Sequence, residues 1–155
     1  MKLYNNLEPE LIDVDCTQTS TEEILKEMVH VLKLKNKISD ESFVYKKLIE
    51  REKLGSTSIG NRSAVPHTKL KEIKKPVISI AISKKGIMYH ESDEHPVHLV
   101  ILILSPNNSP IIHLQILAAA ASLIKNSKNL VKNILTVKTA EELLDMVKKY
   151  ETLDD

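Results

Sequence analysis

The stretch Pro96-Val-His-Leu-Val-Ile-Leu-Ile-Leu-Ser105 is a nearly continuous apolar run rich in β-branched residues. A second run, Pro76-Val-Ile-Ser-Ile-Ala-Ile-Ser83, has the same character. Runs of this kind predict central strands that are buried on both faces, because a strand with one solvated face would alternate apolar and polar residues. Helical patterns precede and follow the two runs. We therefore expect an α/β fold whose sheet is covered by helices on both faces.

Four helices are predicted from the residues at their starts, each a capping side chain or a first-turn proline. These starts are Ser20 with Glu23, Ser39 or Asp40, Ser109-Pro110, and Thr139 with Glu142. In the first helix, apolar residues recur at spacings of three and four, which indicates an amphipathic helix. The second helix is expected to end near Glu52 and the third near Lys125. A shorter helix is expected within residues 126–137.

Composition limits the class of protein. The 155 residues, 42% of them hydrophobic, predict one domain over residues 1–155 with an aliphatic core. Basic and acidic residues number 22 and 21 and are mixed along the chain, so a nucleic-acid partner is not expected. Cys16 is the only cysteine and the first residues form no secretion signal, so we expect a reduced, cytoplasmic location. No apolar run reaches the roughly 18 residues that a membrane span needs, so direct membrane insertion is not expected.

A loop of small residues beside a histidine is the clearest functional signal: Arg51-Glu-Lys-Leu-Gly55-Ser-Thr-Ser-Ile-Gly60-Asn-Arg-Ser-Ala-Val-Pro66-His67-Thr-Lys69. Gly55 and Gly60 can adopt positive φ, so backbone amides can approach an anion, and the three hydroxyls between them add donors without bulk. Pro66 restricts the backbone directly before His67. The arrangement is typical of a phosphate-handling site.

His67 is the candidate nucleophile. An imidazole with an ordinary pKa of about 6.5 is largely neutral near pH 7, so one ring nitrogen has a lone pair that can attack phosphorus without a metal. Arg51 is the local candidate for holding the phosphoryl oxygens, because its guanidinium can bind two of them at once, whereas Lys69 supplies a point charge. His113 follows the predicted helix start at Pro110, where the helix dipole favours an anion.

Each of these residues also has a purely structural interpretation. His67 could be an ordinary loop residue, and His113 could be a satisfied core histidine on an apolar helix. Arg51 could complement the dipole at the end of its helix. Thr57 and Asn61 are candidate phosphate contacts, but both residue types also shape turns through local hydrogen bonds.

Residues 51–67 resemble the signature of the type-2 enzyme IIA domains of the bacterial phosphoenolpyruvate-dependent sugar phosphotransferase system, the mannitol, fructose and nitrogen-regulatory family. Residues 96–105 resemble the central strand of that family, and His113-Leu-Gln-Ile-Leu117 resembles its second histidine on a helix. The resemblance implies a single three-layer α/β domain with a mixed sheet of about five strands. It also implies a phosphotransferase with a phosphohistidine intermediate on His67, with His113 and Arg51 beside it and no cofactor or metal.

The same resemblance implies the partners. HPr would donate the phosphoryl group, and an enzyme IIB domain or protein would accept it during uptake of a fructose-class or mannitol-class sugar. The alternative is a nitrogen-type regulatory protein in which phosphorylation of His67 controls protein binding without sugar transport. A third possibility is an inactive relative that acts as a binding scaffold. Ser58 and Arg62 depart from the small residues that the family often has there, and Arg62 would add a charge near the site.

Two rival motifs are weaker. The stretch from Gly55 to Gly60 resembles the start of a P-loop, but Asn61-Arg62 stands where Lys followed by Ser or Thr is required. The cluster His90-Glu-Ser-Asp-Glu-His95-Pro-Val-His98 contains several potential metal ligands, yet its spacing fits no standard zinc pattern and favours a turn between strands. His30 is expected at the surface of the first helix.

Overall fold

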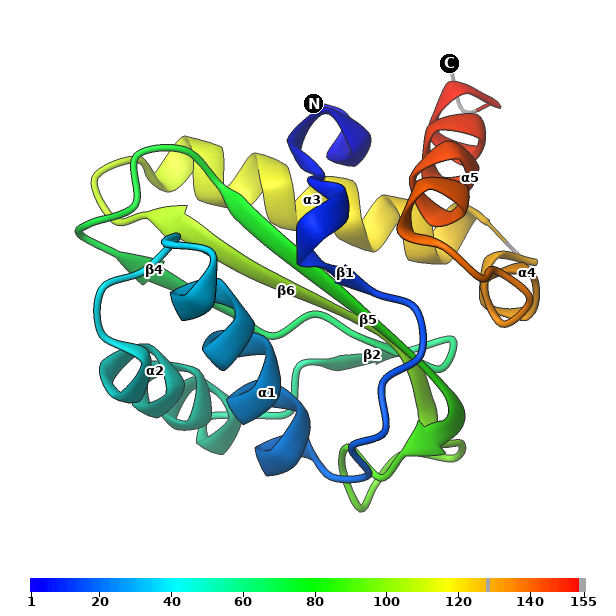
Figure 1. Cartoon of the computed structure of the whole chain (residues 1–155), viewed down its shortest axis with the longest axis horizontal. Coiled ribbons are helices and arrows are strands. Elements are labelled where there is room, and N and C mark those ends of the chain that lie inside the picture. Colours follow the sequence, from blue (N-terminus) through cyan, green and yellow to red (C-terminus); the bar gives the residue numbers. More distant parts are fainter. Residues whose placement is uncertain (128, 154–155) are drawn as a thin grey trace.

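The computed structural model describes residues 1–127 and 129–153, and it is built on one six-stranded mixed sheet (Figure 1). The strand order is β1-β5-β6-β3-β2, and β4 also pairs with β6. The strands are β1 (Ile12–Asp13), β2 (Ser58–Gly60), β3 (Ser63–Ala64), β4 (His67–Leu70), β5 (Val77–Ile87) and β6 (Val97–Pro106). The expected central strands are β5 and β6, which run antiparallel to each other. The six strands agree with the expected mixed sheet of about five.

Four of the five α-helices of the described residues begin at the predicted starts. They are α1 (Thr21–Leu34), α2 (Glu41–Lys53), α3 (Pro110–Asn126), α4 (Leu130–Ile134) and α5 (Ala140–Leu153), with short 3-10 helices η1 (Leu3–Asn6) and η2 (Pro9–Leu11) near the start of the chain. Ser20 accepts the amide of Glu23, and Thr139 accepts the amide of Glu142. Of the two candidates for the second cap, Asp40 is the one used. Helix α4 is the short helix expected within 126–137; Lys128 in that range lies outside the described residues.

Residues on β5 and β6 alternate between two hydrophobic cores. One core, on the side of α1 and α2, takes Ala81, Val100, Leu102 and Leu104 from the strands. The other core, on the side of α3, α4 and α5, takes Ile78, Ile80, Ile82, Leu99, Ile101 and Ile103. Successive side chains of a strand point to opposite faces of a sheet, so both faces of these strands are buried and the expected three-layer arrangement is confirmed (Figure 1).

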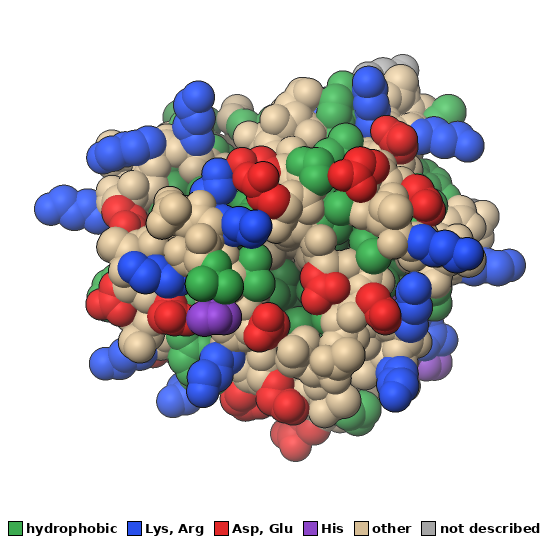
Figure 2. Space-filling view, in the orientation of Figure 1, with side chains coloured by type: hydrophobic (Ala, Val, Ile, Leu, Met, Phe, Trp, Pro, Cys, Tyr) green, Lys and Arg blue, Asp and Glu red, His purple; other side chains and the backbone are tan. Residues whose placement is uncertain are grey.

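The molecular surface carries both signs of charge. Lys and Arg side chains are interspersed with Asp and Glu side chains over the face shown in Figure 2. None of the helices within residues 1–127 and 129–153 is long and apolar enough to cross a membrane.

The position of the predicted site follows from the register at one end of the sheet. Strand β4 runs parallel to β6 and places His67 opposite Ile103. The chain leaves β6 at Pro106 and enters α3 at Pro110, so His113 lies in the first turn of a helix that begins near the same end. Two histidines that are far apart in the sequence are thereby brought to one edge of the fold.

Candidate functional site

His67 lies at the first position of β4 and is held by its own backbone neighbourhood. Its Nδ1 lies 2.7 Å from the carbonyl oxygen of Val65. Because a carbonyl oxygen only accepts hydrogen bonds, Nδ1 carries the hydrogen and donates it. In a neutral imidazole, the lone pair is then on Nε2. The half-buried ring therefore has a defined tautomer with Nε2 as its nucleophilic atom.

The surroundings of His67 favour the neutral ring. Burial lowers its pKa below the usual 6.5, and the positive charge of Arg51 acts in the same direction. The hydrogen bond to Val65 and the negative charge of Glu52 oppose this shift and raise the pKa, but the net change is downward. The imidazole is consequently unprotonated near pH 7, which is the state that a nucleophile requires.

His113 lies beside His67 as expected. The centroids of the two rings are 5.6 Å apart and their planes are inclined by 54°. Burial lowers the pKa of His113, and the charges of His67 and Lys69 lower it further. Nδ1 of His113 is buried and has no hydrogen-bond partner within the described residues. The site thus contains a second imidazole with unused hydrogen-bonding capacity.

Arg51 lies in the last turn of α2, where its guanidinium is both at the end of the helix and close to His67. Its Nη1 donates a 2.8 Å hydrogen bond to the carbonyl oxygen of Gly55, directly after the helix end. The same guanidinium is close enough to His67 to lower the pKa of that imidazole. Gly55 and Gly60 both have positive φ, of 154° and 83°, as the loop was expected to require.

Thr57 is buried, and its side chain is already occupied. Its hydroxyl hydrogen-bonds to the carboxylate of Glu52 and lies 2.9 Å from the hydroxyl of Tyr89, which itself donates to Glu52 at 2.6 Å. The backbone amide of Thr57 donates to the same carboxylate at 3.0 Å. Burial and the charge of Glu52 raise the pKa of Tyr89, so its hydroxyl stays protonated. Of the two interpretations of Thr57, the geometry favours the one in which it shapes the loop.

This buried network leads to His67. Glu52 and Tyr89 hold Thr57, and the carbonyl oxygen of Thr57 accepts the amide of Val65 at 3.0 Å. The carbonyl oxygen of Val65 in turn accepts the Nδ1 hydrogen of His67. A chain of hydrogen bonds therefore connects the small-residue loop to the orientation of the imidazole.

Asn61 and Arg62 lie away from His67. The amide of His98 donates to the carbonyl oxygen of Arg62 at 2.8 Å, five residues before Ile103, the β6 partner of His67. Since strand residues are spaced by about 3.3 Å, the separation along the sheet is about 17 Å. The side chain of Asn61 donates to the carbonyl oxygen of Ile124 at the far end of α3. The structure therefore does not bring Asn61 close to His67, which favours its turn-shaping interpretation. The charge of Arg62 also lies away from His67, in contrast to the expectation.

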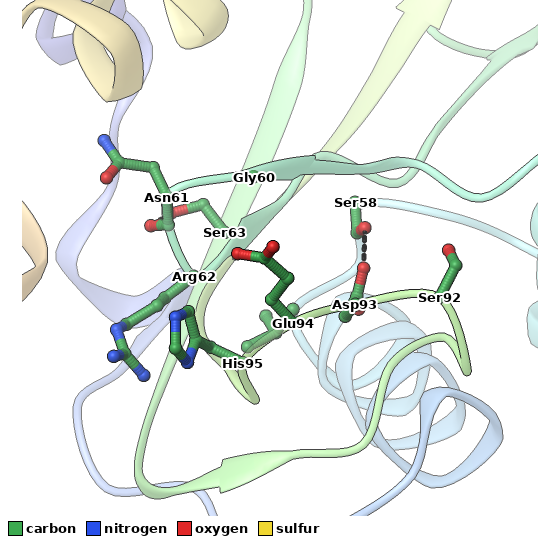
Figure 3. A pocket seen from close by; sticks show the side chains of 10 residues that line it. Ser58, Gly60, Asn61, Arg62, Ser63, Ser92, Asp93, Glu94 and His95 are labelled. Atoms are coloured by element: carbon green, nitrogen blue, oxygen red, sulfur yellow. Dashed lines mark hydrogen bonds between the residues drawn. The ribbon is translucent and has the colours of Figure 1, made fainter.

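Arg62 instead borders a polar hollow of about 270 Å³ between the β2–β3 turn and the segment before β6 (Figure 3). Ser58 also lines this hollow, and its hydroxyl donates to the carboxylate of Asp93. Both residues that depart from the family pattern are thus involved in a surface distinct from the histidine pair.

The structure also shows where the P-loop-like stretch and the histidine cluster lie. The loop after Gly55 runs from α2 into β2, so no helix begins there to bind a nucleotide phosphate. Residues 88–96 connect β5 to β6, as the turn interpretation expected. Across the part of the chain that the structure describes, no group of three or more His, Cys, Asp or Glu side chains is placed to hold a metal ion. His30 is exposed on α1 and pairs with Glu41 at 3.1 Å.

Glu52 and Tyr89 were not recognised as site residues from the sequence. Glu52 stands next to Arg51 in the quoted motif, but nothing local shows that its carboxylate turns into the loop. Tyr89 lies 32 residues from Thr57, and only the antiparallel return of the sheet brings it near. Its one sequence signal is that it belongs to the 3% of residues that are aromatic.

The amino-acid sequence matches a known protein family. Residues 5–150 match the model of the family described as "Phosphoenolpyruvate-dependent sugar phosphotransferase system, EIIA 2". The chain is 28% identical to the PTS system fructose-specific EIIABC component of Bacillus subtilis (strain 168), over 97% of this chain and 24% of that protein. It therefore spans about a quarter of the length of that relative.

Two solved structures share the fold. Nitrogen regulatory protein IIA-Ntr from Neisseria meningitidis superposes with a TM-score of 0.83 at 26% identity, over 93% of this chain and 97% of that chain. The IIA chain in a complex of enzyme IIAMTL and phosphorylated enzyme IIBMTL from Escherichia coli gives a TM-score of 0.75 at 21% identity, over 92% of this chain and 97% of that chain. The chain is thus similar to sugar-specific and to nitrogen-regulatory proteins.

Proposed function

The chain belongs to the EIIA 2 family of the phosphoenolpyruvate-dependent sugar phosphotransferase system, and we propose on this basis that it is a phosphoryl carrier that uses His67. The observation that carries the proposal is the arrangement of the two histidines. Nδ1 of His67 is bound to Val65, which leaves Nε2 free beside a second imidazole whose ring centre is 5.6 Å away. This is the geometry of a nucleophile with a neighbouring hydrogen-bond donor.

In the proposed reaction, the lone pair of Nε2 attacks the phosphorus of an incoming phosphohistidine donor. A new phosphorus–nitrogen bond forms to His67, and the bond between phosphorus and the donor nitrogen breaks, with its electron pair returning to the donor. The hydrogen on Nδ1 stays in place and continues to donate to Val65. Because His67 is already neutral, no base is needed to remove a proton before the attack.

A phosphoryl group on His67 would carry about −1.5 to −2 charges and would need nearby positive charge and hydrogen-bond donors to stabilise it. Arg51 already affects His67 electrostatically, and Lys69 affects His113. His113 can donate from its ring to a phosphoryl oxygen. We assign Arg51 and His113 to holding the transferred group and Thr57 to positioning the loop.

The surface next to the site suits a protein partner. Ile111 and Leu114 are 68% and 66% exposed on the first turns of α3, on either side of His113 in the sequence. Leu54, which follows the α2 helix of Arg51, is 85% exposed. Exposed apolar side chains of this size around a reactive group favour docking of another protein. We propose HPr as the donor and an enzyme IIB domain or protein as the acceptor; the partner in the Escherichia coli complex is a phosphorylated enzyme IIBMTL.

A nitrogen-regulatory role is the second candidate, in which the same phosphorylation would control binding to proteins outside sugar uptake. The similarity to IIA-Ntr of Neisseria meningitidis, with a TM-score of 0.83 at 26% identity, supports it. Both candidates need the same chemistry at His67, so the difference lies in which protein the phosphorylated or unphosphorylated form binds.

Phosphoryl acceptance is tested by incubating the chain with phosphoenolpyruvate, enzyme I and HPr, followed by intact-mass measurement at alkaline pH. One added phosphoryl group is expected. His67→Gln should remove the label, whereas the control His30→Gln, which changes an exposed imidazole on α1, should label fully. Full labelling of the His67→Gln chain would contradict the proposal.

The protein that receives the phosphoryl group distinguishes the sugar-uptake role from the regulatory role. Transfer from the phosphorylated chain to a purified enzyme IIB of the fructose or mannitol class supports sugar uptake. Binding of a non-transport protein that depends on the phosphorylation state, with no transfer to enzyme IIB, supports regulation.

A further inference from the structure

A basic hollow of about 350 Å³ lies at the opposite end of α3 from His113. It is formed between the turn joining β2 and β3, the start of β6, and helix α4. The side chains that line it are Asn61, Arg62, His98, Val131, Lys132 and Leu135. Three of these six carry basic nitrogens, and no acidic side chain of the described residues lines the hollow. Its charge and size therefore suit a small anion.

The two permanent cations of the hollow have no partner among the described residues. Neither the guanidinium of Arg62 nor the ammonium of Lys132 makes a hydrogen bond or an ion pair with any residue in 1–127 or 129–153. Arg62 comes from the hairpin and Lys132 from α4, so the hollow is bounded by cations from two separate elements. A guanidinium of this kind can hold two oxygens of a phosphate at once, and a nearby ammonium adds a point charge.

His98 contributes a third group in a defined orientation. Its Nδ1 lies 2.7 Å from the carbonyl oxygen of Ser83, so Nδ1 donates and Nε2 is the remaining nitrogen. The backbone amide of His98 donates to the carbonyl oxygen of Arg62 at 2.8 Å, which places the two residues side by side. With this tautomer, Nε2 can accept a hydrogen bond from a hydroxyl of the ligand.

The turn that carries Arg62 is held in one conformation. Asn61 and Arg62 have φ of 55° and 57°, a region that is unfavourable for residues with a side chain. The side chain of Asn61 donates to the carbonyl oxygen of Ile124 at 2.7 Å, and Ser63 donates to the carbonyl oxygen of Asn61 at 3.0 Å. These bonds fix the backbone of the turn, so the Cα atom of Arg62 stays at the edge of the hollow.

Carboxylates lie on the other side of Arg62. Asp93 and Glu94 line the neighbouring hollow, and Figure 3 shows Glu94 directed away from the guanidinium of Arg62 while His95 lies next to it. These acids line the first hollow and not the second, and a carboxylate near a cation weakens its attraction for an anion. Removal of one of them is expected to strengthen anion binding.

We propose that the hollow lined by Arg62, His98 and Lys132 binds a small phosphorylated molecule. This second site is separate from the phosphoryl acceptor. A helix rises by about 1.5 Å per residue, so His113 and Ile124, which is bound to Asn61, are about 16 Å apart along α3. The inference does not rest on the proposed function, because none of its residues belongs to the histidine pair.

The site is tested by titrating inorganic phosphate and glucose 6-phosphate into ¹⁵N-labelled protein and following amide resonances. The titration uses the Arg51→Gln, His67→Gln double variant, which removes binding at the phosphoryl site. Amides of residues 61–63, 98 and 131–135 are expected to shift in a saturable manner. Arg62→Gln should weaken binding by about tenfold or more, and Lys132→Gln by several-fold, because each loses a charge-assisted contact. Glu94→Gln should tighten it.

Two controls make the result decisive. Lys46→Gln removes a charge from an exposed position on α2, across the sheet, and should leave the affinity unchanged. Arg62→Lys retains the charge but loses the two-oxygen contact, and it should fall between the parent and Arg62→Gln. Saturable shifts that Arg62→Gln does not weaken, equal binding of chloride or sulfate, or no shift in this region at tens of millimolar phosphate would each overturn the proposal. A preference for glucose 6-phosphate over inorganic phosphate would identify the ligand class as an organic phosphate.

Discussion

The imidazole rings of His67 and His113 lie beside each other with their centroids 5.6 Å apart and their planes inclined by 54°, one from the start of β4 and the other from the first turn of α3. Both elements flank the end of β6, which explains how the pair forms. At this distance, a positive charge on either ring disfavours protonation of the other. Both rings are therefore neutral near pH 7. A phosphoryl group on His67, as we propose, would put a negative charge beside His113 and favour its protonation.

The coupling of the two rings predicts the effect of removing one. In His67→Gln, the pKa of His113 should rise toward 6.5, because a charge that lowers it is lost. Imidazole resonances followed by NMR over pH 5 to 8 measure this change. His30→Gln serves as the control and should leave His113 unchanged. An unchanged titration of His113 in His67→Gln would show that the rings do not interact electrostatically.

Arg51 is predicted to act on His67 through its charge. Arg51→Gln should raise the pKa of His67 and slow phosphoryl acceptance, on the order of a hundredfold, if the guanidinium stabilises the transferred group. Lys53→Gln is a matched control, because Lys53 is an exposed cation in the same last turn of α2. Both variants weaken the interaction with the helix dipole, so equal rates in the two would assign Arg51 a structural role only.

Stability is predicted to fall in mild acid. The folded-state pKa values of His67 and His113 are lowered, so the unfolded chain binds more protons than the folded one once the pH falls through the unfolded value of about 6.5. The free energy of unfolding should therefore decrease below that pH and recover above it. Urea denaturation at pH 5.5 and 7.5 tests this. The His67→Gln, His113→Gln double variant should show a smaller difference between the two pH values, and an equal difference would contradict the assignment.

The buried network at the loop is predicted to contribute to stability. Tyr89→Phe removes the hydroxyl that donates to Glu52 at 2.6 Å and contacts Thr57, and should cost about 1–3 kcal/mol. Tyr45→Phe, at a partly exposed position on α2, should stay within about 0.5 kcal/mol of the parent. Urea denaturation measures both. If the two variants are equally stable, the hydrogen bond from Tyr89 to Glu52 makes no measurable contribution to the free energy of unfolding.

Two glycines are predicted to differ in their tolerance of a side chain. At Gly86, φ is +97° and an added Cβ would lie 2.6 Å from Cβ of Pro96, so Gly86→Ala should cost about 2–5 kcal/mol through backbone strain and overpacking. At Gly60, φ is +83° but nothing lies within 4 Å, so Gly60→Ala should cost about 1–2 kcal/mol. Denaturation midpoints compare them. A greater loss at Gly60 would contradict this account of the β5–β6 connection.

Structural features that depend only on residues close together in the sequence could be predicted from the sequence. Capping residues, apolar runs and a loop motif are local, and the helix starts at Ser20, Asp40 and Thr139 and the strands β5 and β6 all follow from them. The motif around His67 also identified the nucleophile candidate, because its chemistry depends on residue type and on the adjacent proline.

Contacts between segments that are far apart in the sequence could be found only in the folded structure. The register of the strands sets these contacts, and no local sequence pattern encodes a register. Asn61 and Arg62 lie only six and five residues before His67, yet the extended path beside β6 carries them about 17 Å away. The same sheet brings Tyr89 to Thr57, and α3 brings His113 to His67. Residue types along the chain therefore determined which chemistry was available, and long-range packing decided which of those residues could act together.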